Sequence, residues 1–142
     1  MENIKLSNHF TLAEFCNLGK YPDNIPTVQQ IANMAYGCRQ LLEPARKAIG
    51  CPIIVNSGFR NPRVNALVGG VRNSQHQYGQ AADLCIDGDM QKGKRWFEWI
   101  KIHCEFDQLI WEHNAKGSYW VHVSYRADGK NRKKVIDKLI KK

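Results

Sequence analysis

The spacing of apolar residues predicts two helices in the first third of the chain. Thr11 and Glu14 match a capping box, in which two side chains satisfy free backbone amides at a helix start, so a short helix should follow. A longer helix should begin after Thr27 and end at Gly50. Pro44 should kink this helix because proline cannot donate a backbone hydrogen bond. The apolar positions that define the long helix recur at helical spacing and are Ile31, Ala35, Cys38, Leu42, Ala45 and Ile49.

Four short segments have the pattern of β-strands. A β-branched run at 51–56 predicts a buried strand, and another strand is expected at 83–86. Residues 107–112 and 119–125 flank turn-forming residues at 114–117, so they should form an antiparallel hairpin.

The remaining segments complete the expected architecture. Residues 61–79 contain glycines, asparagines and a proline without any period, which predicts a long ordered loop of the kind that is usually functional. Residues 91–103 should form a second substantial helix, with its aromatic side chains in the core. The expected fold class is α+β, with helices packed on a small, mainly antiparallel sheet.

Length and composition are those of one domain spanning 1–142, because 142 residues with 43% hydrophobic content suffice for a core. The five cysteines are odd in number and form no Cys-x-x-Cys pair, so we expect reduced, buried thiols. The first residues lack the apolar segment of an export signal, and no stretch approaches the roughly 18 apolar residues of a membrane span. We therefore expect synthesis in the cytoplasm without a signal peptide.

The net charge of +8 is concentrated in a basic tail that begins at about Arg126 and holds eight basic and two acidic residues. The run 129–134 raises the possibility of nucleic-acid binding. No aromatic residue interleaves its lysines and no nucleic-acid motif accompanies it, so this function is not favoured. A solvated tail that attracts anionic polymers or lipid head groups fits the same charge.

Candidate metal ligands lie in the segment 74–83. His76 and Asp83 bracket a glycine turn, and zinc accepts imidazole nitrogen and carboxylate oxygen. A catalytic zinc site needs three protein ligands and an open fourth position, so a third ligand must come from elsewhere. His122 is the candidate, because polar and apolar residues alternate over 120–124 and put its side chain opposite two valines.

A candidate base lies on the partner strand of the same hairpin. Glu112 ends that strand, and a turn of this length would set it close to His122. Hydrolysis requires a carboxylate beside a zinc-bound water. The four side chains therefore predict a hydrolytic metal centre.

The fixed residues Ser74, His76, Gly79, Ala81 and Asp83 spell Ser-x-His-x-x-Gly-x-Ala-x-Asp. This is the signature of the zinc D-alanyl-D-alanine carboxypeptidase family of peptidoglycan peptidases, which most of the chain resembles. The family includes D,D-dipeptidases and phage endolysins and shares a fold with the Hedgehog signalling domain. The resemblance implies Zn²⁺ as the cofactor and a peptidoglycan peptide as the substrate.

Carried over position by position, the resemblance implies that His76, Asp83 and His122 bind zinc and that Glu112 is the catalytic base. One departure concerns the base: along the sequence, Glu112 is separated from His122 by more residues than in the Glu-x-x-His motif of several members. His113 is the nearest competitor for that role.

Two further residues have roles implied by the resemblance. Arg60, in the sequence Ser-Gly-Phe-Arg, matches the family's substrate arginine and would stabilise the oxyanion or grip a substrate carboxylate. Ser74 would hydrogen-bond the substrate or support His76. We expect the zinc at one end of the sheet, in a shallow cleft.

The expected function is a zinc peptidase that hydrolyses peptide bonds in the stem peptides or cross-links of bacterial cell walls, at a D-amino acid. It would act as a carboxypeptidase or as an endopeptidase. The alternative is a non-catalytic zinc-binding interaction domain of Hedgehog-like fold. Without an export signal, a wall enzyme would need a phage-type release, as endolysins have, and the basic tail would contact anionic wall polymers.

Overall fold

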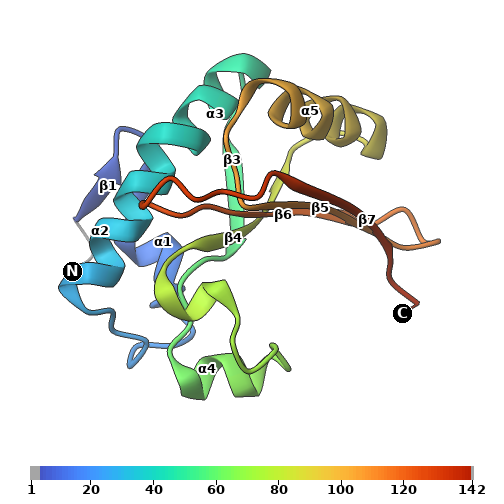
Figure 1. The fold of residues 1–142 in the computed structure, drawn as a ribbon. Coiled ribbons are helices and arrows are strands. Elements are labelled where there is room, and N and C mark those ends of the chain that lie inside the picture. Colours follow the sequence, from blue (N-terminus) through green and yellow to red (C-terminus); the bar gives the residue numbers. More distant parts are fainter. Residues whose placement is uncertain (1–3, 142) are drawn as a thin grey trace.

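A five-stranded sheet forms the centre of an α+β fold in the computed structural model, which describes residues 4–141 (Figure 1). Four of its strands are antiparallel to their neighbours, and the last strand of the chain is parallel to the strand beside it. The predicted fold class, helices on a mainly antiparallel sheet, is confirmed. In sheet order the strands are β3 (Ile53–Ser57), β4 (Ala81–Ile86), β6 (Tyr119–Ser124), β5 (Gln108–His113) and β7 (Lys134–Leu139).

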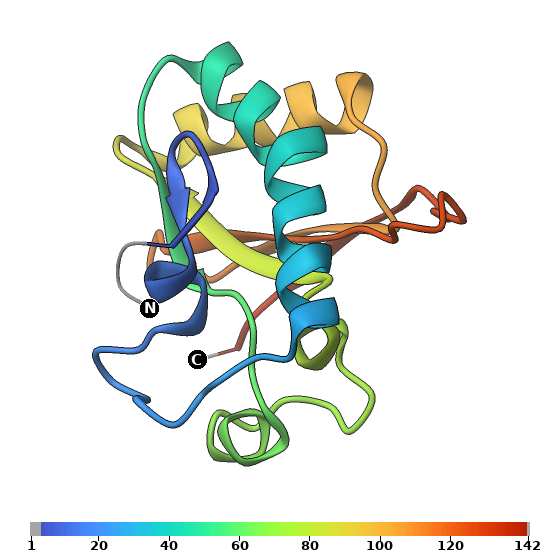
Figure 2. The same ribbon diagram turned by 90° about the vertical axis from the view of Figure 1, so that its left-hand side faces the viewer.

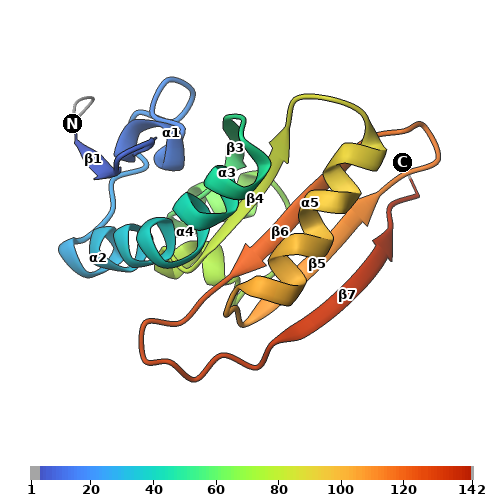
Figure 3. The ribbon, with the colours of Figure 1, turned by 90° about the horizontal axis from the view of Figure 1, so that it is seen from above.

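Helices lie on both faces of this sheet. The long helix of residues 28–49 and α5 (Met90–His103) lie over one face, while α4 (Pro62–Leu67) and the short helix η2 (Gln75–Tyr78) lie on the other (Figure 1). Seen from above, α5 lies over β6 and β5 (Figure 3). In the side view, the N-terminal hairpin and α1 lie beside the long helix (Figure 2). The remaining elements are β1 (Lys5–Ser7), β2 (Phe10–Thr11), α1 (Leu12–Cys16), α2 (Val28–Gly37), the π-helix η1 (Cys38–Leu42), α3 (Glu43–Ile49), α4 (Pro62–Leu67), the 3₁₀ helix η2 (Gln75–Tyr78) and α5 (Met90–His103).

The predicted long helix exists, but it is made of three successive helical segments. Thr27 caps α2 in a capping box with Gln30, and Gly50 ends α3 in the left-handed conformation at φ 71°. The helical path continues through Pro44, because the wider π turn of η1 comes just before this residue. Proline has no N–H and its ring crowds the carbonyl four residues earlier, and a widened turn relieves both problems.

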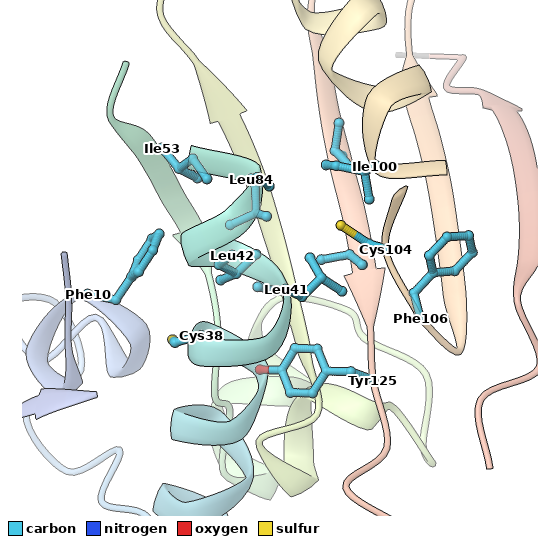
Figure 4. Packing of buried hydrophobic residues seen from close by; sticks show 14 of the residues in the cluster. Phe10, Cys38, Leu41, Leu42, Ile53, Leu84, Ile100, Cys104, Phe106 and Tyr125 are labelled. Carbon is cyan, nitrogen blue, oxygen red and sulfur yellow. The ribbon is translucent and has the colours of Figure 1, made fainter. Parts of the chain in front are cut away.

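The core lies between the sheet and the long helix together with α5. Alternate residues of the central strands, such as Leu84, Val121 and Val123, are buried on this face. Leu41 and Leu42 from η1 and Ile100 from α5 pack toward them (Figure 4). The residues between them in the same strands project from the other face of the sheet, and this face carries the polar site.

Several segments differ from the sequence-based expectation. The expected loop 61–79 contains α4 and η2, because Asn61 and Ser74 each cap a short helix. The expected basic tail is not a free extension, since its residues 134–139 form the strand β7. The β1–β2 hairpin was not predicted.

The cysteines are free thiols: Cys16, Cys38 and Cys104 are buried as expected, whereas Cys51 and Cys85 are only partly buried. Burial raises the pKa of Cys16 to about 12, so its thiol stays protonated. Within residues 4–141, no helix combines the length and apolar character that crossing a membrane requires.

Candidate metal centre

The register of the sheet brings two of the three predicted ligands together. Asp83 of β4 pairs directly with His122 of β6, so both side chains project from the same face. This face is the one opposite the buried core, on the side where η2 lies (Figure 1). The site therefore lies on this face of β4 and β6, where Asp83 is also aligned with Ser57, the last residue of β3.

The third predicted ligand, His76, is presented by η2. Ser74 caps this turn, because its Oγ accepts a hydrogen bond from the His76 amide at 3.2 Å. Gly79 ends it in the left-handed conformation. The side chains of Gln30 and Asn33 in α2 donate to backbone carbonyls of the same turn at 3.2 and 2.9 Å. The imidazole is thus held from both ends of its turn and from the neighbouring helix.

The ligand atoms converge on one point. His122 Nδ1 lies 2.9 Å and His76 Nε2 3.4 Å from the same Asp83 oxygen, Oδ1. One ligand atom from each of the three residues lies within 4.8 Å of the others. The structure therefore brings together all three residues that the sequence indicated.

The tautomer of His76 is set by its backbone partner. Its Nδ1 lies 2.6 Å from the carbonyl oxygen of Gly58, and a carbonyl can only accept, so Nδ1 carries the hydrogen. The other nitrogen, Nε2, then presents its lone pair toward Asp83 and His122. This is the arrangement in which a second partner orients a metal-binding histidine.

Arg60 holds the other oxygen of Asp83. Its Nη2 donates to Asp83 Oδ2 at 3.1 Å, Nη1 to Asn65 Oδ1 at 3.2 Å, and Nε to Ser57 Oγ at 2.9 Å. All three guanidinium nitrogens are thus engaged by protein groups. Arg60 lines the site as predicted, and its bond to Asp83 orients a ligand carboxylate, while the second N–H of Nη1 and of Nη2 is not used by these three bonds.

The carboxylate of Asp83 stays ionised in this setting. Burial acts to raise its pKa, but the neighbouring imidazoles of His122 and His76 outweigh burial and hold the pKa below its usual value. Two imidazoles and one carboxylate form a common zinc donor set. Bonds of about 2.0–2.1 Å in a tetrahedral site separate ligand atoms by about 3.3–3.4 Å. The 3.4 Å from His76 Nε2 to Asp83 Oδ1 matches this separation, and the 2.9 Å from His122 Nδ1 is shorter. The residues therefore fit a zinc ion with three protein ligands.

Glu112 lies on the same face as the three ligands. In the β5–β6 pair, Glu112 is opposite Trp120 and Ile110 is opposite His122, so Glu112 and His122 are diagonal neighbours, about 7–8 Å apart at the backbone. Its side chain is 14% exposed. Burial and the charge of Asp83 raise the pKa of Glu112, although His122 acts in the opposite direction. A carboxyl group with a raised pKa beside a metal site is suited to proton transfer.

His113 does not share this position. Successive residues of a strand point to opposite faces, and His113 Nε2 lies 2.6 Å from Asp137 Oδ1 on the other side of the sheet. It is not among the residues that line the cleft. The geometry thus favours Glu112 over His113 as the base.

An open cleft of about 940 Å³ surrounds these side chains. Tyr78 and Trp120 both line it, as do Ser74 and the apolar side chains of Val68 and Val71. Sequence reasoning did not find the part of the lining that comes from β7 and the segment before it, which is Arg126, Ala127, Asp128, Arg132 and Lys138. The basic composition of that segment was the available signal, but a solvated tail has the same composition.

Two comparisons with known proteins agree with this geometry. A profile of the family Peptidase M15 matches residues 8–124, which include every predicted site residue. The zinc D-Ala-D-Ala carboxypeptidase of Streptomyces albus G is 54% identical over 44 residues, which are 30% of this chain and 17% of that protein. Because the profile covers most of the sequence, the chain belongs to the Peptidase M15 family.

Proposed function

We propose that the protein is a zinc-dependent peptidase that hydrolyses peptide bonds in bacterial peptidoglycan, in stem peptides or cross-links, at a D-amino acid. Membership of a peptidase family supports a peptide substrate. The similarity to a zinc D-Ala-D-Ala carboxypeptidase supports the D-amino acid and the metal.

One observation carries this proposal: His76, Asp83 and His122 converge within 4.8 Å in an open cleft that Glu112 also lines. A metal held only for stability is normally closed off by a fourth protein ligand, whereas a catalytic zinc keeps one position open. Here a carboxylate that is not one of the three ligands lies beside them.

The residues of the chain would divide the chemistry as follows. A Zn²⁺ ion bound by the three ligands supplies Lewis-acid polarisation of a carbonyl oxygen and lowers the pKa of water. Glu112 accepts the proton of the attacking water and returns it to the leaving amine. Arg60 keeps the Asp83 carboxylate oriented, and the carbonyl of Gly58 keeps the tautomer of His76.

Digestion of purified peptidoglycan tests the proposal. Zinc-loaded protein should release fragments whose masses differ from the substrate by hydrolysed peptide bonds, and the masses distinguish a carboxypeptidase from an endopeptidase. The matched control is His122→Ala, which removes a ligand from the open face and should release no fragments. Failure of the wild-type protein to release fragments under any metal condition would contradict the proposal.

An endolysin role is a special case of the same proposal. It predicts that the purified protein lowers the turbidity of cells whose walls have been made accessible. Digestion of isolated peptidoglycan without any effect on such cells would leave the peptidase function and remove the endolysin role.

A further inference from the structure

The C-terminal strand brings a lysine into the cleft. β7 lies beyond residue 124, where the family match ends, and pairs in parallel with β5 so that Lys138 is aligned with Glu112. Aligned residues of neighbouring strands project from the same face. Lys138 Nζ lies 4.0 Å from Glu112 Oε1, and both side chains line the cleft.

The start of this strand is firmly attached to the rest of the sheet. Arg132 donates from Nε and Nη2 to both oxygens of Asp107, each at 2.9 Å, and the Asp107 side chain is only 1% exposed. The amides of Lys133 and Lys134 donate to the carbonyls of Phe106 and Asp107. The backbone that carries Lys138 therefore has a defined position beside β5.

Lys138 differs from the other cations of the cleft. Within residues 4–141 the lysines and arginines that line it are Arg60, Arg126, Arg132 and Lys138. The three arginines hydrogen-bond carboxylates at 3.1, 2.7 and 2.9 Å. Lys138 is farther from its carboxylate than a hydrogen bond allows, and its side chain is 60% exposed. Its ammonium thus has donors that no group in the described residues uses.

We propose that Lys138 determines substrate specificity by binding a carboxylate of the peptide close to the bond that is cut. This inference rests on the proposed peptidase function. Arg60 already binds Ser57, Asn65 and Asp83 with one N–H from each guanidinium nitrogen, so the Lys138 ammonium, 4.0 Å from Glu112 Oε1, is the more available cation. An extended peptide advances roughly 3.3 Å per residue, so an ammonium 4.0 Å from the proposed base reaches a carboxylate within about two residues of the scissile bond.

Two sources offer this chemistry. One is the α-carboxylate at the end of a peptide, which a carboxypeptidase would meet. The other is the side chain of an acidic residue inside the peptide, which an endopeptidase would meet. Both present the same group to the lysine, so only paired substrates distinguish them.

The test uses four peptides that contain D-Ala-D-Ala and differ at two places. The C-terminus is a carboxylate or an amide, and the residue before D-Ala-D-Ala is glutamate or glutamine. For the zinc-loaded protein, Lys138→Ala should raise KM about five- to tenfold for the peptides with the recognised carboxylate and leave kcat within about twofold. Lys138→Ala should not change KM for the matching peptides in which an amide replaces that carboxylate. Lys138→Arg should have a KM close to that of the wild-type protein for the carboxylate peptides.

Lys134→Ala is the matched control. Lys134 lies on the same strand and the same face, aligned with Gln108, but it does not line the cleft. This variant should behave as the wild-type protein on all four peptides. Unfolding midpoints of the three variants show whether the strand is retained.

Two results would overturn the role of Lys138. One is an equal rise of KM for carboxylate and amide peptides. The other is a fall of kcat with KM unchanged, which would mean that the lysine acts on Glu112. If the wild-type protein cleaves none of these peptides, calorimetric binding decides the inference, while the digestion of peptidoglycan decides the proposed function separately. Weaker binding of carboxylate peptides alone by the Lys138→Ala variant would support the inference. Equal affinity of the variant and the wild-type protein for these peptides, or no detectable binding by the wild-type protein, would reject it.

Discussion

Replacing Gly79 by alanine should destabilise the turn that carries His76. Gly79 has φ +71°, and a Cβ built there would lie 2.5 Å from the carbonyl oxygen of Gln30 and 3.2 Å from Met34 Cγ. The carbonyl belongs to the backbone of α2, so it cannot rotate away as a side chain would. Either the turn or the helix must move.

Gly69→Ala is a matched control for the backbone conformation. Gly69 has φ +73°, nearly the same as Gly79, but a Cβ there would meet nothing within 4 Å. The left-handed conformation costs a non-glycine residue about 1–2 kcal/mol, and overpacking adds about 1–3 kcal/mol. Gly79→Ala should therefore lower the free energy of unfolding by about 2–5 kcal/mol and Gly69→Ala by about 1–2 kcal/mol.

Urea unfolding in the presence of a chelator measures both variants without any contribution from metal. Any effect of alanine on the entropy of the unfolded chain is common to the two and cancels in their difference. Gly79→Ala should also weaken zinc binding, because the turn that positions His76 shifts. A Gly79→Ala protein as stable as Gly69→Ala would refute the close docking of this turn on α2.

Three further predictions concern the metal and the ion pairs. Zinc at about 100 times its dissociation constant should raise the free energy of unfolding by about 2.7 kcal/mol, as a thermal shift detects, and His122→Ala should abolish this gain. Arg60→Ala should lower zinc affinity about 10- to 100-fold in a chelator competition, because Asp83 loses its orienting partner; unchanged affinity would contradict that role. Arg132 holds the pKa of Asp107 at about 2, below its ordinary value of 3.8, so this pair stabilises the fold above that ordinary value and its contribution is lost as the pH falls to about 2. Asp107→Asn should remove this part of the pH dependence in unfolding experiments between pH 5 and 2, and a profile identical to that of the wild-type protein would argue against the pair.

The metal ligands could be predicted because residues that lie close together in the sequence indicate them. His76 and Asp83 are close in sequence, on either side of a glycine turn, and the alternation around His122 showed which face it shares. Glu112 was expected near His122, and the hairpin register does place them diagonally on one face. Each of these inferences depends on a short segment of chain.

Features that depend on pairing between distant segments could not be predicted in the same way. The β4–β6 register, which sets Asp83 opposite His122, joins strands that are far apart in sequence. β7 is held to β5 by backbone hydrogen bonds, which side-chain composition does not report, so a lysine-rich strand resembled a solvated tail. The three guanidinium nitrogens of Arg60 meet partners from three separate elements, and only the folded chain shows these contacts.

The central claim is that His76, Asp83 and His122 bind a catalytic zinc and that Glu112 transfers the proton. The most direct measurement is the release of product from a D-Ala-D-Ala peptide by zinc-loaded wild-type protein and by Glu112→Gln, with the zinc content of both samples determined. We expect one zinc per chain in each sample, turnover by the wild-type protein, and a loss of at least about 100-fold in the variant. Equal turnover by the two zinc-loaded proteins would contradict the role of Glu112, and wild-type protein that binds no zinc would contradict the site.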